Sequence, residues 1–142
     1  MTTDADRALI ALLREDARAS TAELARRLGV SRTTVQSRLE RLERNGVIAG
    51  YSVKLSADHE KNLVRAHILV TALPKLAAAV EVVLKRIPEV RTLHSVSGNF
   101  DMIIVVEAPS VRDLDALIDR IGALEGVERT LSSIILSTRI DR

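Results

Sequence analysis

Short polar side chains and arginines alternate along the segment from Ser31 to Arg44. These groups donate and accept hydrogen bonds without blocking the close approach of another surface. A guanidinium can bind guanine, and a glutamine amide can bind adenine, each through two hydrogen bonds that give roughly 1–3 kcal/mol of discrimination. The segment therefore indicates a surface suited to the base edges and phosphates of double-stranded DNA.

Arginine is also concentrated in this part of the chain. Six arginines between Arg26 and Arg44 stand against only Glu40 and Glu43, a local excess of +4, whereas the whole chain has a net charge of +2. Such an excess is typical of a phosphate-binding surface. A solvated helix face with ion pairs, such as one between Glu40 and Arg44, explains the charge equally well.

Three short helices are predicted to position these residues. The first covers about residues 4–16, with leucines along one side. The second starts at Ser20, which forms a predicted capping box with Glu23, and ends at Gly29. Ser31 caps the third helix. The two closely spaced helices predict a helix-turn-helix, within an N-terminal domain of residues 1–50.

On a helical wheel, the third helix directs Val35, Leu39 and Leu42 inward and most of its polar residues outward, while Arg32 and Arg38 flank the core. In a helix-turn-helix the N-terminal residues of the second helix reach base edges, and arginines further along contact phosphates, which fixes register. Backbone N–H groups at the start of the preceding helix could also bind a phosphate. A three-helix protein-binding module is the alternative. The expected DNA contacts are Ser20, Thr21, Arg32, Thr33, Thr34, Gln36, Ser37, Arg38 and Arg41.

The remainder of the chain predicts a different domain. Residues 47–55 are expected to form a wing-like ribbon, and residues 51–63 the ribbon's end and a linker. Residues 64–142 predict the order β-α-β-β-α-β, an α+β, ferredoxin-like sheet with both helices on one face. The strands are expected at 64–71, 90–96, 102–107 and 127–138, and the helices at 75–87, buried through Leu76, Val80, Val83, Leu84 and Ile87, and after Ser110.

Three of these strands carry apolar residues on both sides. That is excessive for a sheet with one face in water, and the second face is therefore expected to pack on another subunit.

The loop Gly98-Asn99-Phe100-Asp101 lies between the two strands expected to be central. Glycine permits the close approach of a ligand. The Asp101 carboxylate could accept an α-ammonium group, and free N–H groups of the loop could bind an α-carboxylate. The spacing alone favours a tight connection without a ligand. His94 lies near the loop, as a second candidate contact or as a packed strand residue.

Several classes of function find no support. The chain has no cysteine, and Tyr51 and Phe100 are its only aromatic residues. His59 and His67 lack metal-ligand spacing, and no nucleophile–base set or phosphate loop appears. No apolar run is long enough to span a bilayer, and Met1–Asp4 do not begin a secretion signal. A cytoplasmic, nucleoid-associated protein that is not an enzyme is expected, although an effector-binding adaptor or a small enzyme without DNA activity remains the alternative.

Two motifs resemble one known family. The segment Ser31–Tyr51 resembles the helix-turn-helix signature of the Lrp/AsnC (feast/famine) transcriptional regulators, and Val96–Asp101 resembles the glycine-aromatic-aspartate loop of their effector domain. The resemblance covers 6–139, with departures at Thr2-Thr3, where leucine and aspartate are usual, and at Ala17.

This resemblance implies a sequence-specific transcription regulator that binds double-stranded DNA and senses a small effector, an amino acid, without a cofactor or metal. It also implies homodimers that assemble into higher oligomers, up to an octamer of four dimers. The effector would bind between dimers, in contact with Gly98, Asn99, Phe100, Asp101, Thr130 and Ser132.

Overall fold

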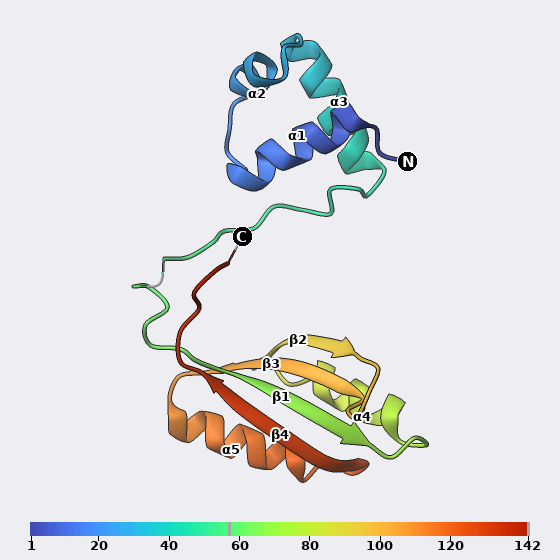
Figure 1. Cartoon of the computed structure of the whole chain (residues 1–142), viewed down its shortest axis with the longest axis vertical. Coiled ribbons are helices and arrows are strands. Elements are labelled where there is room, and N and C mark those ends of the chain that lie inside the picture. The colour runs from blue at the N-terminus through green and yellow to red at the C-terminus, as the bar shows by residue number, and fades with distance from the viewer. Residues whose placement is uncertain (57, 142) are drawn as a thin grey trace. The chain divides into compact units, whose positions relative to one another are not determined.

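The computed structural model describes residues 1–56 and 58–141. The chain folds as two compact units, Met1–Lys54 and Leu55–Arg142; Figure 1 draws their elements. Within the described residues no helix is both long and apolar enough to cross a membrane.

The first unit contains three helices, α1 (Asp4–Glu15), α2 (Thr21–Leu28) and α3 (Arg32–Arg44). The apolar positions recur at helical spacing, so one stripe of each helix faces the other two. The three helices that the sequence predicts here are confirmed, within one or two residues at their ends. Their stripes enclose a small aliphatic core formed by Leu9, Leu13, Leu24, Ala25, Val35 and Leu42.

The turn between α2 and α3 is built as the residue types predict. The Ser20 hydroxyl accepts a hydrogen bond from the Glu23 N–H, and the Ser31 hydroxyl accepts one from the Thr34 N–H. Gly29 ends α2 in the left-handed conformation. The capping box at Ser20 is only half formed, because the Glu23 carboxylate binds Arg26 rather than the start of α2.

The predicted ribbon after α3 is wrong. Of residues 47–56, all within the described part of the chain, none belongs to a strand. The segment is instead attached to α3, because the Ile48 N–H donates to the Leu42 carbonyl and the Tyr51 hydroxyl donates to Glu43 at 2.7 Å. That hydrogen bond raises the pKa of Tyr51.

The second unit is a four-stranded antiparallel sheet with two helices. The elements are β1 (Val64–Ala72), α4 (Ala77–Lys85), β2 (Val90–Ser95), β3 (Met102–Ala108), α5 (Val111–Gly122) and β4 (Val127–Ile135). The strand order in the sheet is β2-β3-β1-β4, which fits the predicted ferredoxin-like fold. The expectation that the loop of residues 98–101 joins two central strands is wrong, because β2 lies at an edge.

The core of this unit lies between one face of the sheet and both helices. Figure 1 shows α4 and α5 on the same side of the strands. The inward residues of β1 and β3, such as Ile68 and Ile104, are fully buried against aliphatic residues of the helices, Leu84 of α4 among them. The predicted burial of Val83 is wrong, since this side chain is 41% exposed, and Leu76 is only half-buried.

The other face of the sheet has no helix over it. Alternation along the strands places Leu69, Ile103, Val105 and Leu131 on this face, with Leu69 paired opposite both Ile103 and Leu131. Leu131 remains 55% exposed. The predicted apolar second face is therefore present as a contiguous surface across β3, β1 and β4, although β4 ends at Ile135, three residues earlier than expected.

Gly126 allows close packing at the start of β4. Its φ of 95° lies in the region that favours glycine, and a Cβ atom there would lie 2.7 Å from the Leu76 Cβ and 2.9 Å from a methyl group of Val80. The Gly126 carbonyl accepts a hydrogen bond from the Leu73 N–H at 2.8 Å. This close approach holds the segment before α4 against the sheet.

Candidate nucleic-acid interface and ligand loop

The first half of α3 presents a polar, uncovered face. Arg32, Thr33, Gln36 and Ser37 are exposed, as the helical wheel predicts. Thr34 is half-buried, and its hydroxyl lies 2.8 Å from the Ser31 hydroxyl that caps the helix. The residues expected to meet base edges are therefore brought together on one surface, with the start of their helix fixed by the Ser31 cap.

Gln36 is already engaged by a neighbour one turn along α3. Its Nε2 donates to Glu40 Oε1 at 2.9 Å, which replaces the Glu40–Arg44 pair expected from the sequence. The carboxylate accepts only hydrogen bonds, so it holds the NH₂ end of the amide toward itself. One N–H and the carbonyl oxygen of Gln36 remain for a base.

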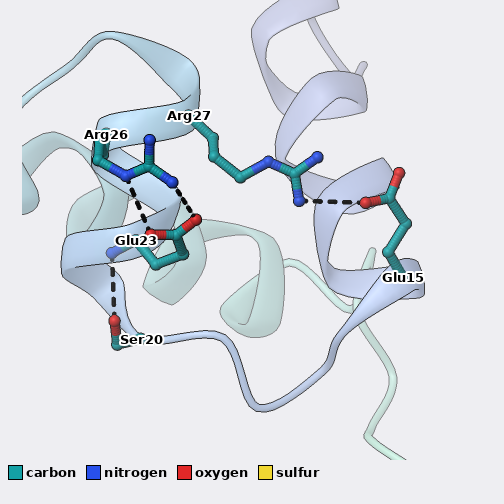
Figure 2. Close-up of polar contacts among 5 residues, drawn as sticks. All are labelled: Glu15, Ser20, Glu23, Arg26 and Arg27. Atoms are coloured by element: carbon teal, nitrogen blue, oxygen red, sulfur yellow. Dashed lines mark hydrogen bonds and ion pairs between the residues drawn. The ribbon is translucent and has the colours of Figure 1, made fainter.

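Two of the six clustered arginines are neutralised within the helical unit. Figure 2 shows Arg26 against Glu23 and Arg27 against Glu15. Arg26 binds both carboxylate oxygens of Glu23, at 2.5 and 3.1 Å. The hydrogen bond from Arg26 lowers the pKa of Glu23. Arg27 reaches Glu15 at 3.1 Å and so links α2 to the end of α1.

A third arginine is committed to a buried carboxylate. Arg41 Nη2 lies 2.5 Å from Asp6 Oδ1. Asp6 is fully buried, whereas the Arg41 side chain is 42% exposed. The prediction that Arg41 points outward is therefore wrong for its guanidinium, because a tertiary partner 35 residues away draws it toward α1. The expected binding of a phosphate by Arg41 stays a prediction.

Asp6 is also one half of a capping box on α1. The Thr3 N–H donates to Asp6 Oδ2 at 2.9 Å, and the Asp6 N–H donates to the Thr3 hydroxyl at 3.2 Å. The backbone hydrogen bond from Thr3 is the main cause of the lowered pKa of Asp6; burial opposes it, and the Thr3 hydroxyl and Arg41 add to it. Sequence reasoning missed this site, although Thr3-x-x-Asp6 is a variant of the capping-box pattern.

Pairing divides the six arginines equally. Arg26, Arg27 and Arg41 have acidic partners, so the ion-pair interpretation holds for half of the cluster. In the described part of the chain Arg32, Arg38 and Arg44 show no ion pair. These three all lie on α3, and the unbalanced positive charge is therefore concentrated on the helix that carries the exposed polar face.

The predicted N-terminal phosphate site at α2 stays a prediction. The Ser20 hydroxyl caps the helix by accepting from the Glu23 N–H, and Thr21 is half-buried. Ser20 is exposed and its hydroxyl keeps its own hydrogen to donate, so it could join the backbone N–H groups that are predicted to bind a phosphate here.

The loop from Gly98 to Asp101 is attached to the end of β1. The Asp101 N–H donates to the Val70 carbonyl at 2.9 Å, and Asp101 Oδ2 accepts from the Ala72 N–H at 2.8 Å. The β1–β4 register shifts between Thr71 and Ala72, so the carboxylate satisfies an N–H at the irregularity. Thr71 Oγ1 is 3.5 Å from the Asn99 carbonyl. Asp101 thus closes the loop through Oδ2.

The loop also reaches β4. The Arg129 guanidinium lies 5.2 Å from the centre of the Phe100 ring, a cation–π contact that no sequence pattern predicts. Thr130 and Ser132, also expected at the ligand, pair with inward-facing residues of β1 and so lie on the opposite face of β4 from Arg129. His94 pairs with Ile103 and is exposed on the face without helices.

The residue types that bind metals are scattered through the fold. Among the described residues, no three or more of His, Asp and Glu come together in a way that could hold a metal ion. His67 lies in β1 opposite Val105 and Ser133, and His59 lies before β1.

Comparison with known families matches both units. Residues 65–142 match the Lrp/AsnC ligand binding domain, and residues 2–49 match a winged helix-turn-helix DNA-binding domain. Among curated proteins, the HTH-type transcriptional regulator LrpA of Mycobacterium tuberculosis is 39% identical over 95% of this chain and 90% of its own length. The regulator LysM of Saccharolobus solfataricus is 26% identical, over 95% of this chain and 94% of its own length.

Solved structures agree with these matches. AsnC of E. coli is 26% identical with a TM-score of 0.88, covering 100% of this chain and 97% of that one. A feast or famine regulatory protein from M. tuberculosis, complexed with L-methionine, is 38% identical with a TM-score of 0.86, covering 97% of this chain and 94% of that one.

Proposed function

The chain belongs to the Lrp/AsnC family of DNA-binding transcriptional regulators, and we propose that α3 reads a specific duplex sequence while the second unit senses an amino acid. Membership of the family makes it a transcription regulator with a ligand-binding domain, and not an enzyme. The observation that carries the proposal is the exposed face of α3, where hydrogen-bonding side chains stand beside arginines without an ion pair among the described residues.

Two kinds of DNA contact are proposed on α3. Thr33, Gln36 and Ser37 would meet base edges in the major groove. Arg32 and Arg38 would bind phosphates, contacts that fix orientation and carry no sequence information. Thr34 would contribute mainly through the cap, because its hydroxyl lies against Ser31. This division assigns specificity and affinity to different residues. A protein with these contacts would act at chromosomal DNA in the cytoplasm.

A symmetric dimer is proposed through the sheet face without helices. Leu69, Ile103, Val105 and Leu131 form an apolar surface there, and water contact with that surface is unfavourable. Two copies of α3 could then enter successive major-groove turns, roughly 34–36 Å apart, on a near-palindromic operator. Association of such dimers, up to four, would give the higher oligomers that the family resemblance implies.

The proposed effector is an amino acid held at the loop between β2 and β3. Gly98 has a φ of 109°, which favours glycine and leaves the backbone uncovered by a side chain. Asp101 Oδ1 is the carboxylate oxygen not used by Ala72, and it would accept an α-ammonium group. Support comes from the relative complexed with L-methionine. Such an effector would alter DNA binding only by binding two assemblies unequally.

The DNA proposal is tested by selecting duplexes from a random library and measuring their affinity by fluorescence anisotropy across salt. Gln36→Ala is expected to relax preference at one base pair and leave the salt slope unchanged. Arg38→Met should weaken all sequences alike and reduce the slope by about 0.9 for each phosphate that the arginine no longer neutralises. Equal effects of both variants on every sequence, or no selected sequence at all, would reject the proposal.

The effector proposal is tested by a thermal-shift screen of the twenty amino acids, with light scattering on the same samples. At least one amino acid is expected to raise the unfolding temperature of the wild-type chain and change the size of the assembly. No shift with any amino acid at millimolar concentration would contradict the proposed ligand class.

The proposed dimer interface is tested separately. Leu131→Asp should yield monomers at concentrations where the wild type is dimeric.

A further inference from the structure

We propose that Asp6 and Arg41 form a positioning pair for α3, so that Arg41 acts on DNA affinity through Asp6 and not by binding a phosphate. Neither residue then needs to touch DNA, although both determine how α3 enters the groove. The inference rests on the proposed reading function of α3, and it changes the role that the sequence suggests for Arg41.

The contacts of Asp6 leave no oxygen unused. Oδ2 accepts from the Thr3 N–H and Oδ1 from Arg41 Nη2. Asp6 is the single polar or charged residue that is fully buried in the described part of the chain. Since a buried carboxylate is costly without partners, this arrangement holds Thr3, the start of α1 and Arg41 in a defined relation.

The pair adds a directional contact to the aliphatic packing of α1 against α3. Asp6 lies in the first turn of α1, and Arg41 lies in the last turn of α3. The core that the helices share includes Leu9, Val35 and Leu42. Aliphatic contacts are non-directional, whereas a hydrogen bond to a buried carboxylate is directional. The Asp6–Arg41 contact therefore sets the rotation and axial position of α3. These determine the direction in which the proposed base-contacting residues Thr33, Gln36 and Ser37 face.

Charge pairing separates Arg41 from its neighbour Arg38. The Asp6–Arg41 pair is neutral as a unit, so a nearby phosphate would gain little from it. Arg38 is half-buried on the same helix and has no ion pair among the described residues. Only an unpaired guanidinium is expected to release counterions when DNA binds. The two arginines therefore make a matched comparison one turn apart.

The experiment measures anisotropy of one selected duplex with the full-length chain over a salt series. The variants are Asp6→Asn, Arg41→Met, their combination, and Arg38→Met as the control. Asparagine and methionine keep the approximate shape of the residues that they replace. Circular dichroism and the fluorescence of the single tyrosine, Tyr51, identify the temperature range in which each variant is folded, and affinities are compared there.

Three results are expected together. Asp6→Asn and Arg41→Met each weaken binding about tenfold, similar to the effect of removing one good base contact, and Arg41→Met keeps the salt slope of the wild type. The double variant is no weaker than the single ones, because both remove one interaction. Arg38→Met has a slope smaller by about 0.9 for each phosphate that Arg38 neutralises in the wild type.

The proposal is overturned if Arg41→Met reduces the slope as Arg38→Met does, or if Asp6→Asn binds as well as or better than the wild type. The first result would mean that Arg41 binds a phosphate in the wild type, and the second that Arg41 binds DNA well without its contact to Asp6. If neither Arg38→Met nor Gln36→Ala affects DNA binding, the proposed reading function of α3 fails, and the positioning role fails with it. Should Asp6→Asn not fold at any temperature, Arg41→Met and its slope still decide between the two roles.

Discussion

Each unit of the protein holds a key element in place with one aspartate, and the two aspartates differ in what they need. Asp6, in the helical unit, is fully buried and binds both a backbone N–H and a guanidinium. Asp101, in the sheet unit, is exposed and binds the Ala72 N–H through one oxygen. The first contact depends on charge, whereas the second requires only an acceptor.

The exposed face of α3 and the loop from Gly98 to Asp101 are also held in place by different kinds of contact. The aim of α3 depends on a tertiary contact between residues 35 positions apart. The loop from Gly98 to Asp101, where the effector is proposed to bind, is held mainly by hydrogen bonds to the end of the strand β1. Substitution of Asp6 should therefore destabilise the helical unit as a whole, whereas substitution of Asp101 should affect only the loop.

The largest effect is expected from alanine at each aspartate. Asp6→Ala leaves Arg41 and the start of α1 without their partner, and it should lower the unfolding temperature of the helical unit by about 5–10 °C. Asp101→Ala should shift that of the sheet unit by less than about half as much. Tyr51 fluorescence follows the first unit and hydrogen exchange of β1 follows the second. Equal shifts would remove the distinction.

Asparagine gives the next largest effect and sharpens the comparison. Asp101→Asn keeps an oxygen for the Ala72 N–H, so stability should change by less than about 0.5 kcal/mol. Asp6→Asn removes the charge that Arg41 requires and should remain clearly destabilised. Calorimetry with an amino acid found in the screen then separates two roles of Asp101: weaker affinity in Asp101→Asn indicates an ammonium contact, while unchanged affinity indicates loop closure alone.

Acid should weaken the helical unit through Asp6. Its pKa is lowered in the folded chain, so the stabilisation is present above the unfolded value, taken as 3.8, and is lost as the pH falls through the lower folded pKa. The lowered pKa of Glu23 acts in the same direction. Unfolding followed by Tyr51 fluorescence between about pH 5 and about pH 2 should show this loss. If the stability of the wild type fell no more steeply with decreasing pH than that of Asp6→Asn, a contribution of Asp6 to acid sensitivity would be contradicted.

The smallest effect is expected where the loop meets β4. The contact between Phe100 and Arg129 is partly exposed, and such cation–π contacts contribute about 0.5–1 kcal/mol. Phe100→Leu, Arg129→Gln and the double variant form a cycle whose coupling energy in thermal unfolding should lie in that range. A coupling of zero would show that the loop is held by its hydrogen bonds to β1 alone.

Much of the fold could be predicted because the relevant signals are local. Apolar spacing predicts the helices and strands, and serines at 20, 31 and 110 each accept the expected N-cap hydrogen bond. The segment 47–55 is misleading because its apolar pairs resemble a ribbon, whereas its observed contacts are with α3. The exposure of Val83 could not be predicted, since helix spacing alone does not show how wide a stripe of α4 is buried.

The site was less predictable because side-chain partners depend on tertiary structure. Exposure of Thr33, Gln36 and Ser37 follows from the helical wheel. Whether an arginine is free or paired does not, since Asp6 and Glu15 come from another helix. The place of Thr130 at the ligand rests on a resemblance, and strand register puts its side chain on the face toward α5.

The assignment of sequence reading to α3 is tested most directly by the ratio of specific to non-specific DNA affinity when Thr33, Gln36 and Ser37 are all replaced by alanine. Affinities for the selected duplex and for a shuffled duplex of equal length are measured at one salt concentration. We expect the ratio to fall toward one while the affinity for the shuffled duplex is retained, because Arg32 and Arg38 remain. A ratio equal to that of the wild type would contradict the assignment.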